Sequence, residues 1–412
     1  MGKTMLSLLP LVALSLPLAA PLSAEAGLPD AAAVNTALDD HPSVVTARAK
    51  VEAARAEARA RAKGPHEITF SGTYNRRTID QEGTFDEYDA QLSRAFRLPG
   101  KAELDRDIGQ FGVDAAQNMA EDAKHQAALL LAGHWWDWLG ASAEAEVDRQ
   151  AAANYEQALA AVKRRVELKD AAPLEADQVE AALGNARLMA QQSEGRANVA
   201  RARLAAHFPA LAVPLQAPPV PAPEIPDGGL EHYRELVLTN SHEIAAADAQ
   251  AGKMNSMAER ARREKMADPS FGVRLFSERG GAEKGAGLVF SMPLGGGHRS
   301  ALSDQAAAEA GAAQADAQMA RFSVREMADS DVAEATYRFG AWQRAREGLN
   351  AQIAALTKLR KGYDLGEIDL ADRLLAERMV HDAFRAEATA RTEAQRAITK
   401  IRIDSHQLWL AD

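Results

Sequence analysis

The chain has 412 residues, a formal net charge of −10 and no cysteine. This length suffices for two domains of ordinary size or for one elongated fold. The lack of cysteine excludes disulfide bonds, thiol chemistry and acylation through sulfur, and the acidic charge disfavours nucleic-acid binding.

The N-terminus has the features of an export signal. Lys3 precedes an apolar run from Met5 to Ala20, and Ala24 and Ala26 form the small-x-small pattern of a cleavage site. We therefore expect residues 1–26 to be a secretory signal peptide. A membrane anchor is the less favoured alternative, because three prolines interrupt the run. No later segment has eighteen uninterrupted apolar residues, so no spanning helix is expected.

Two long tracts without proline predict long helices. One lies between Pro99 and Pro173 and the other follows Pro293, and both are rich in Ala, Glu, Arg and Gln. A heptad seam recurs in the first tract at Tyr155, Leu159, Val162 and Val166. A helix over residues 101–168 would be about 100 Å long, which indicates a coiled coil; whether it is continuous or broken into coaxial pieces stays open.

The chain repeats itself on either side of a proline-rich segment. Residues 209–229 read as an extended linker of polyproline type. The stretch that begins at His41 corresponds to the one at Ser241, and the seam recurs 197 residues later. We therefore predict two repeats, residues 27–208 and residues 230–412.

Each repeat contains two stretches that alternate apolar and polar residues. The apolar positions are Ile68, Phe70 and Tyr74, then Tyr88, Ala90, Leu92 and Phe96, and in the second repeat Phe271, Val273 and Leu275, then Ala286, Leu288, Phe290 and Met292. Such strands fit a membrane barrel with lipid outside, or an ordinary half-buried hairpin. They look short beside the ~9–11 residues of a spanning strand, and the polar segments 80–87 and 277–285 are expected to be their loops.

A glycine-rich turn follows the last strand and resembles a phosphate-binding loop. However, residues 287–304 lack both the Walker spacing and the third glycine of a dinucleotide fingerprint. We interpret Pro99 and Gly100, and Pro293 with Gly295, Gly296 and Gly297, as turns that lead a strand into a helix.

Residues for catalysis or metal binding are sparse. The ten histidines include no i,i+4 pair, and His134 with Asp137 offers two ligands at most. We therefore predict no enzyme activity, no cofactor and no metal site. Trp135, Trp136 and Trp138 are expected to pack helices or to anchor at an interface.

The ordered set of these features resembles the TolC family of outer-membrane efflux channels. The segments "SMPLGGGHRSAL" and "AFRLPGKAEL" are similar to the strand-to-helix signature of this family, and "RVELKDAAPLEADQVEAAL" and "LRKGYDLGEIDLADRLLAER" to its two helix-turn-helix tips. The resemblance covers essentially all of the mature chain. The segments "PLGGGHR" and "AAPLEAD" most resemble those of the branch that serves cobalt–zinc–cadmium efflux.

The resemblance implies a mainly α fold with a β-barrel portion. Three protomers would each give four strands to one twelve-stranded barrel in the outer membrane, and long coiled-coil helices would form a periplasmic α-barrel. The number of strands agrees with an assembly of several protomers, because four strands cannot close a membrane barrel. The implied partners are outer-membrane lipid, a periplasmic adaptor and an inner-membrane pump such as an RND transporter, and no nucleic acid.

The resemblance also implies functional residues at the tips. The adaptor would contact Leu168, Lys169 and Asp170 of one tip and Leu365, Gly366 and Glu367 of the other. Asp372 matches an acidic residue that lines the periplasmic entrance of the family, whereas a second acidic position holds Leu375 here. A ring of Asp372, with Glu175 as a weaker second, would favour cations. The alternative for both is a solvated acidic helix start.

Two other functions stay open. One is a channel for type I protein secretion or for drug efflux. The other is a periplasmic coiled-coil scaffold that forms no channel.

Overall fold

The structure, a computed structural model, describes residues 27–410, so the expected signal peptide lies outside the described residues. Two runs of elements follow one another in the same order. The first contains α1 (Ala31–Asp39), α2 (Pro42–Lys63), β1 (Thr69–Ile79), β2 (Gly83–Ala95), α3 (Lys101–Glu167) and α4 (Pro173–His207). The second contains α5 (Gly229–Asn240), α6 (His242–Glu264), β3 (Ser270–Glu278), the short 3-10 turn η1 (Arg279–Gly281), β4 (Glu283–Ser291), α7 (Gly297–Asp364) and α8 (Leu370–Asp404).

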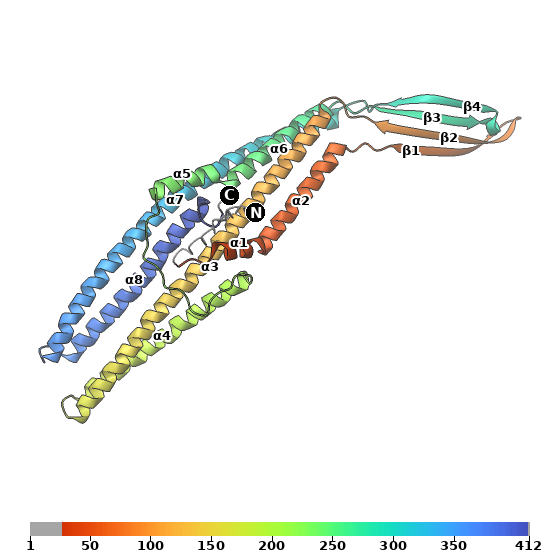
Figure 1. The fold of residues 1–412 in the computed structure, drawn as a ribbon. Coiled ribbons are helices and arrows are strands. Elements are labelled where there is room, and N and C mark those ends of the chain that lie inside the picture. Colours follow the sequence, from red (N-terminus) through yellow and green to blue (C-terminus); the bar gives the residue numbers. More distant parts are fainter. Residues whose placement is uncertain (1–26, 411–412) are drawn as a thin grey trace, which may run out of the picture.

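The molecule is elongated, with the sheet at one end and two helical hairpins at the other (Figure 1). Helices α3 and α7 contain 67 and 68 residues and are continuous, which resolves what the sequence left open. At 1.5 Å per residue each is about 100 Å long. Helix α4 packs along α3, and α8 along α7. Tyr155 and Val162 of the predicted seam are buried in the contact with α4.

The four strands form one antiparallel sheet in the order β1-β2-β3-β4. The pairing of β2 with β3 joins the two repeats. The strands contain 9 to 13 residues, so the expectation that they are short was wrong. The predicted loops were too long, because backbone hydrogen bonds continue the ladders through polar residues such as Thr84, opposite Thr78, and Lys284, opposite Ser277.

The register places apolar side chains in rows across one face of the sheet. Phe70 pairs with Leu92, Leu92 with Val273, and Val273 with Leu288. All four side chains are exposed, Leu288 to 92%. No helix within residues 27–410 covers this face, so the described part of the chain does not half-bury the sheet.

A polar network fastens the sheet to the helices. Lys101, the first residue of α3, is fully buried, and its ammonium lies 2.8 Å from a carboxylate oxygen of Asp268 and 2.7 Å from the carbonyl oxygen of Met266. His66 and the backbone N–H of Leu98 also bond Asp268. Burial raises the pKa of Asp268, but these bonds outweigh burial and lower it overall. The network therefore joins residues before β1, after β2 and before β3.

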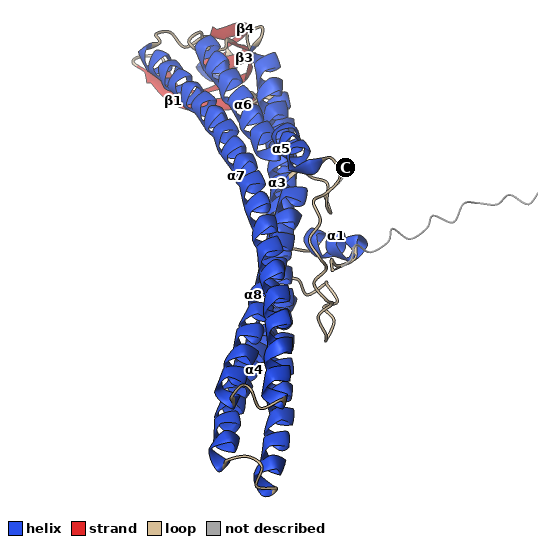
Figure 2. Cartoon of the chain, turned by 90° about the vertical axis from the view of Figure 1, so that its left-hand side faces the viewer, coloured by secondary structure: helices blue, strands red, loops and turns tan. Residues whose placement is uncertain are grey.

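The largest apolar core lies near the middle of the long helices. Trp135, Trp136 and Trp138 are buried there with α1 and the end of α8, so they pack helices. The segment 209–228, between α4 and α5, contains no helix or strand and contributes Leu211 and Val220 to the same core. Figure 2 shows α1 and the loop segments on one side of the helices.

Candidate functional site at the helical tips

The two helical hairpins end in the same backbone turn. Lys169 has a φ of 60°, and Gly366, at the equivalent position, has a φ of 75°. The next residue in each case donates its N–H five residues back, from Asp170 to the Arg165 carbonyl and from Glu367 to the Gly362 carbonyl, both at 2.9 Å. This is the Schellman arrangement that ends a helix.

Each tip presents an exposed leucine beside charged residues. Leu168 and Leu365 end their long helices and are equally exposed, at 64%. Lys169 and Asp170 on one tip, and Gly366 and Glu367 on the other, are exposed too. All six predicted contact residues are therefore open to a partner.

Polar contacts connect one tip to the other within the chain. The Tyr363 hydroxyl lies 2.5 Å from Arg165 Nη1 and 3.3 Å from Glu175 Oε2. The guanidinium of Arg373 lies 4.9 Å from the centre of the Tyr363 ring, close enough for a cation–π interaction. No motif or periodicity in the sequence points to Arg165 or Arg373. A signal existed for Tyr363, which places a hydroxyl at a seam position where the first repeat has Val166.

The two predicted entrance residues have different surroundings. Glu175 is half-buried, and its Oε1 accepts a hydrogen bond from the Ala172 N–H at 3.3 Å, so it caps α4. Asp372 is exposed, while Asp369 takes the capping role by accepting from the Asp372 N–H at 2.8 Å. Glu175 is thus occupied within its own chain, whereas the Asp372 carboxylate faces solvent. Leu375, at the second acidic position of the family, is also exposed.

The predicted strand-to-helix turns lie where the strands lead into α3 and α7. Gly100 precedes α3 with a φ of 81°, and Gly295 has a φ of 87° two residues before α7. Pro99 and Pro293 stand just before these glycines, and Gly296 and Gly297 begin α7. The turns position the sheet and hold no ligand-binding side chains of their own.

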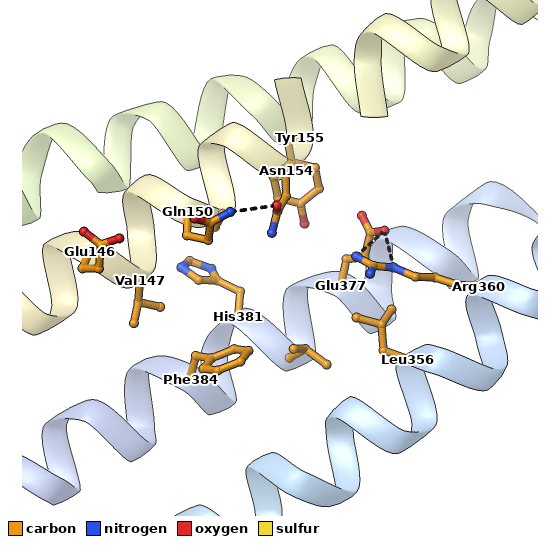
Figure 3. A pocket seen from close by; sticks show the side chains of 12 residues that line it. Glu146, Val147, Gln150, Asn154, Tyr155, Leu356, Arg360, Glu377, His381 and Phe384 are labelled. Atoms are coloured by element: carbon orange, nitrogen blue, oxygen red, sulfur yellow. Dashed lines mark hydrogen bonds and ion pairs between the residues drawn. The ribbon is translucent and has the colours of Figure 1, made fainter. Parts of the chain in front are cut away.

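A groove of about 270 Å³ lies between α3 and the α7–α8 hairpin (Figure 3). Tyr155, Leu356 and Phe384 supply apolar walls. His381 bonds the buried Asp148 at 2.8 Å, and Arg360 pairs with Glu377 at 3.3 Å. The groove therefore lies between the two hairpins, and its lining on α3 ends at Tyr155, 13 residues before Leu168 at the tip.

His134 and Asp137 contact different partners. The His134 ring packs on His207, with 4.7 Å between ring centres, while Asp137 pairs with Arg396. Among the helices described, none has the length and apolar character needed to cross a membrane.

Comparison with known proteins gives matches in structure. No protein-family model and no curated protein matches the sequence. A membrane protein from Pseudomonas aeruginosa matches with a TM-score of 0.76 and 19% identity, over 91% of this chain and 89% of that chain. The outer membrane protein VceC of Vibrio cholerae matches with a TM-score of 0.72 and 16% identity, over 92% and 95%. The MtrE outer membrane channel of Neisseria gonorrhoeae, in its open state, matches with a TM-score of 0.72 and 17% identity, over 92% and 89%.

The chain has the fold of these proteins. The predicted fold class, mainly helical with four strands per chain, is therefore confirmed.

Proposed function

We propose that three copies of this chain form a channel across the outer membrane. The observation that carries the proposal is the sheet: β1 and β4 are its edge strands, and no other element of the described chain covers its apolar face. Four strands cannot close a barrel, and exposed apolar rows are suited to lipid. Three sheets would give twelve strands, and the shared fold with proteins titled outer membrane channels supports a membrane location for the sheet.

In this proposal the channel is a passive conduit in a tripartite efflux system. The long helices would form a tube in the periplasm, and the tips with Leu168 and Leu365 would contact a periplasmic adaptor. An inner-membrane pump, such as an RND transporter, would drive the substrate, so the chain itself catalyses no reaction. A type I secretion or drug-efflux channel would use the same architecture with another pump.

Membrane fractionation and mass measurement in detergent test the assembly. The mature chain should be found in the outer membrane, with the mass of a trimer. A periplasmic monomer would instead identify the coiled-coil scaffold, and the barrel would be wrong.

The proposed cargo is heavy-metal cations. This part of the proposal rests on the residues of the segments that resemble the metal-efflux branch. Deletion of the gene should sensitise the host to zinc, cobalt or cadmium, and plasmid-borne wild type should restore tolerance. Unchanged metal tolerance with new sensitivity to dyes or antibiotics would assign a drug-efflux channel.

A further inference from the structure

Three ionisable side chains converge at the contact of α3 with α6, far from the tips. Asp122 and His125 lie one turn apart on α3, and Glu243 is the second residue of α6. One potential ligand atom from each of them lies within 4.8 Å of the other two. No sequence motif reveals this group, because Glu243 belongs to the other repeat and the two residues on α3 are too few to suggest a metal site by themselves.

His125 is held in a metal-binding orientation. Its side chain is 97% buried, and its Nε2 lies 2.7 Å from Oδ1 of Asp404 on α8. Asp404 is itself fixed by the Lys400 ammonium at 2.7 Å. A carboxylate that binds one imidazole nitrogen fixes the ring so that the other nitrogen can take a metal.

The other nitrogen of His125 points at the carboxylates. Nδ1 lies 3.9 Å from Asp122 Oδ1, which is too long for a hydrogen bond. Among the residues described, Nδ1 makes no hydrogen bond. The ring nitrogen that Asp404 leaves unbound thus lies at ion-pair distance from Asp122 and close to Glu243.

The electrostatics at this point favour a cation. Burial raises the pKa of Asp122, and the charge of Glu243 contributes to the rise. Burial lowers the pKa of His125, but the bond to Asp404 and the nearby carboxylates outweigh burial and raise it overall. A bound cation would offset the charges of both carboxylates. His406 packs on His125, with 5.4 Å between ring centres, and on His242, with 4.8 Å between ring centres.

We propose that Asp122, His125 and Glu243 bind one divalent cation of the zinc class in each chain. One nitrogen and two carboxylate ligands suit Zn²⁺, Co²⁺ or Ni²⁺, with water in the fourth position. Ligand atoms of a tetrahedral zinc site lie about 3.4 Å apart, so ligand atoms that are up to 4.8 Å apart need to approach by up to about 1.4 Å. Asp122 and Glu243 are half-buried, which leaves a path to solvent. The ion would cross-link the two repeats, whether or not the chain conducts metal.

Zinc titration of the full chain in detergent tests the site. Calorimetry at pH 7.5 should give one Zn²⁺ per chain, and X-ray absorption should show one imidazole among oxygen ligands. Asp122→Asn and Glu243→Gln should each weaken binding at least tenfold. Asp404→Asn should weaken it about 10–100-fold through the orientation of His125. Asp107→Asn removes an exposed carboxylate elsewhere on α3 and should leave binding unchanged.

Circular dichroism of each variant separates lost binding from lost folding. If a variant does not fold, the wild-type protein still tests the site, through the number of Zn²⁺ ions that it binds per chain and through its X-ray absorption spectrum. The proposal would be overturned if the wild type bound no stoichiometric zinc or if its X-ray absorption spectrum showed no imidazole ligand. It would also be overturned if folded Asp122→Asn and Glu243→Gln bound zinc with wild-type affinity. One ion per three chains that is lost in Asp372→Asn would also overturn it, and would place the ion at the entrance.

Discussion

Lys101 is among the largest side chains that are fully buried, although it carries a charge. Its ammonium is compensated by Asp268 and by Glu264, whose oxygen lies 3.0 Å away. A buried pair is costly to break, because the remaining charge stays in a poorly solvating environment.

Lys101→Met should therefore destabilise the protein by about 3–5 kcal/mol, since Asp268 would lose its cation. Thermal unfolding in detergent measures the change. Arg344→Ala, which removes an exposed pair with Glu347, is the matched control and should have little effect. Equal midpoints for the two variants would show that the network does not fasten the strands.

Asp331 provides a pH-dependent contribution to stability. Burial, together with the neighbouring Asp404, raises its pKa to about 7, from an ordinary value of 3.8. Between about pH 4 and pH 7 the folded protein keeps this proton and the unfolded chain releases it, so stability falls as the pH rises. Asp404 has a lowered pKa, and its contribution is lost only as the pH falls below about 4.

Asp331→Asn imitates the protonated acid and should remove this dependence. The variant should gain about 1–3 kcal/mol relative to wild type between pH 5 and pH 8. Unfolding midpoints at the two pH values provide the measurement. Asp329→Asn, an exposed position on the same helix, should keep the wild-type slope. If stability changed with pH in the same way in the wild type and both variants, Asp331 would be ionised in the folded protein over the whole pH range.

At the scale of elements, the two tips form a natural comparison. Both turns need a left-handed residue, but only one uses glycine. A side chain with Cβ costs about 1–2 kcal/mol in this region.

Lys169→Gly should therefore stabilise its turn, and Gly366→Ala should destabilise the other by a similar amount. Hydrogen exchange of the amides of Asp170 and Glu367, which close the two turns, reports each change separately. In each variant the unmodified tip is the internal control. Exchange that responds to neither substitution would mean that the turns are set by packing alone.

The faces of the sheet give a second prediction at this scale. Leu288 lies in the apolar row opposite Val273, whereas its neighbour Val289 points to the other face. Arg at position 288 should cost about 2–4 kcal/mol if the face meets lipid at mid-depth, and Arg at position 289 should cost less. Trimer stability on heating in detergent, and urea unfolding from liposomes, measure both variants. Equal losses would argue against a lipid-facing row.

At the scale of the whole molecule, the proposed entrance depends on symmetry. Three exposed Asp372 side chains around one axis would place like charges close together and attract cations. Asp372→Asn should weaken the block of single-channel current by divalent cations in planar bilayers, while trimers still form.

Glu175→Gln is the control for the entrance, because Glu175 is already engaged by Ala172 and Tyr363. It should change cation block less than Asp372→Asn does. An unchanged response in Asp372→Asn would leave Asp372 as an ordinary helix-start residue.

The sequence alone determined the order of elements, the presence of two long helical tracts, and the alternation of the strands, whereas the structure showed that α3 and α7 are continuous. These features depend on neighbours in the chain: proline and glycine mark where α3 and α7 begin, the heptad seam marks a coiled coil, and a period of two marks a strand. The similar turns at Lys169 and Gly366 followed from the repeat. The pattern of apolar residues did not predict where the strands end, because backbone hydrogen bonds continue the strand pairing past polar residues such as Thr84.

Only the tertiary structure decided which side chains meet. Lys101 reaches Asp268, Tyr363 reaches Arg165, and His125 reaches Asp404 across 167, 198 and 279 residues of sequence. No periodicity links such partners, since each bond depends on how two helices or a strand end pack in space. Buried charges must find partners to offset their desolvation, and the packed helices determine which partner is within reach.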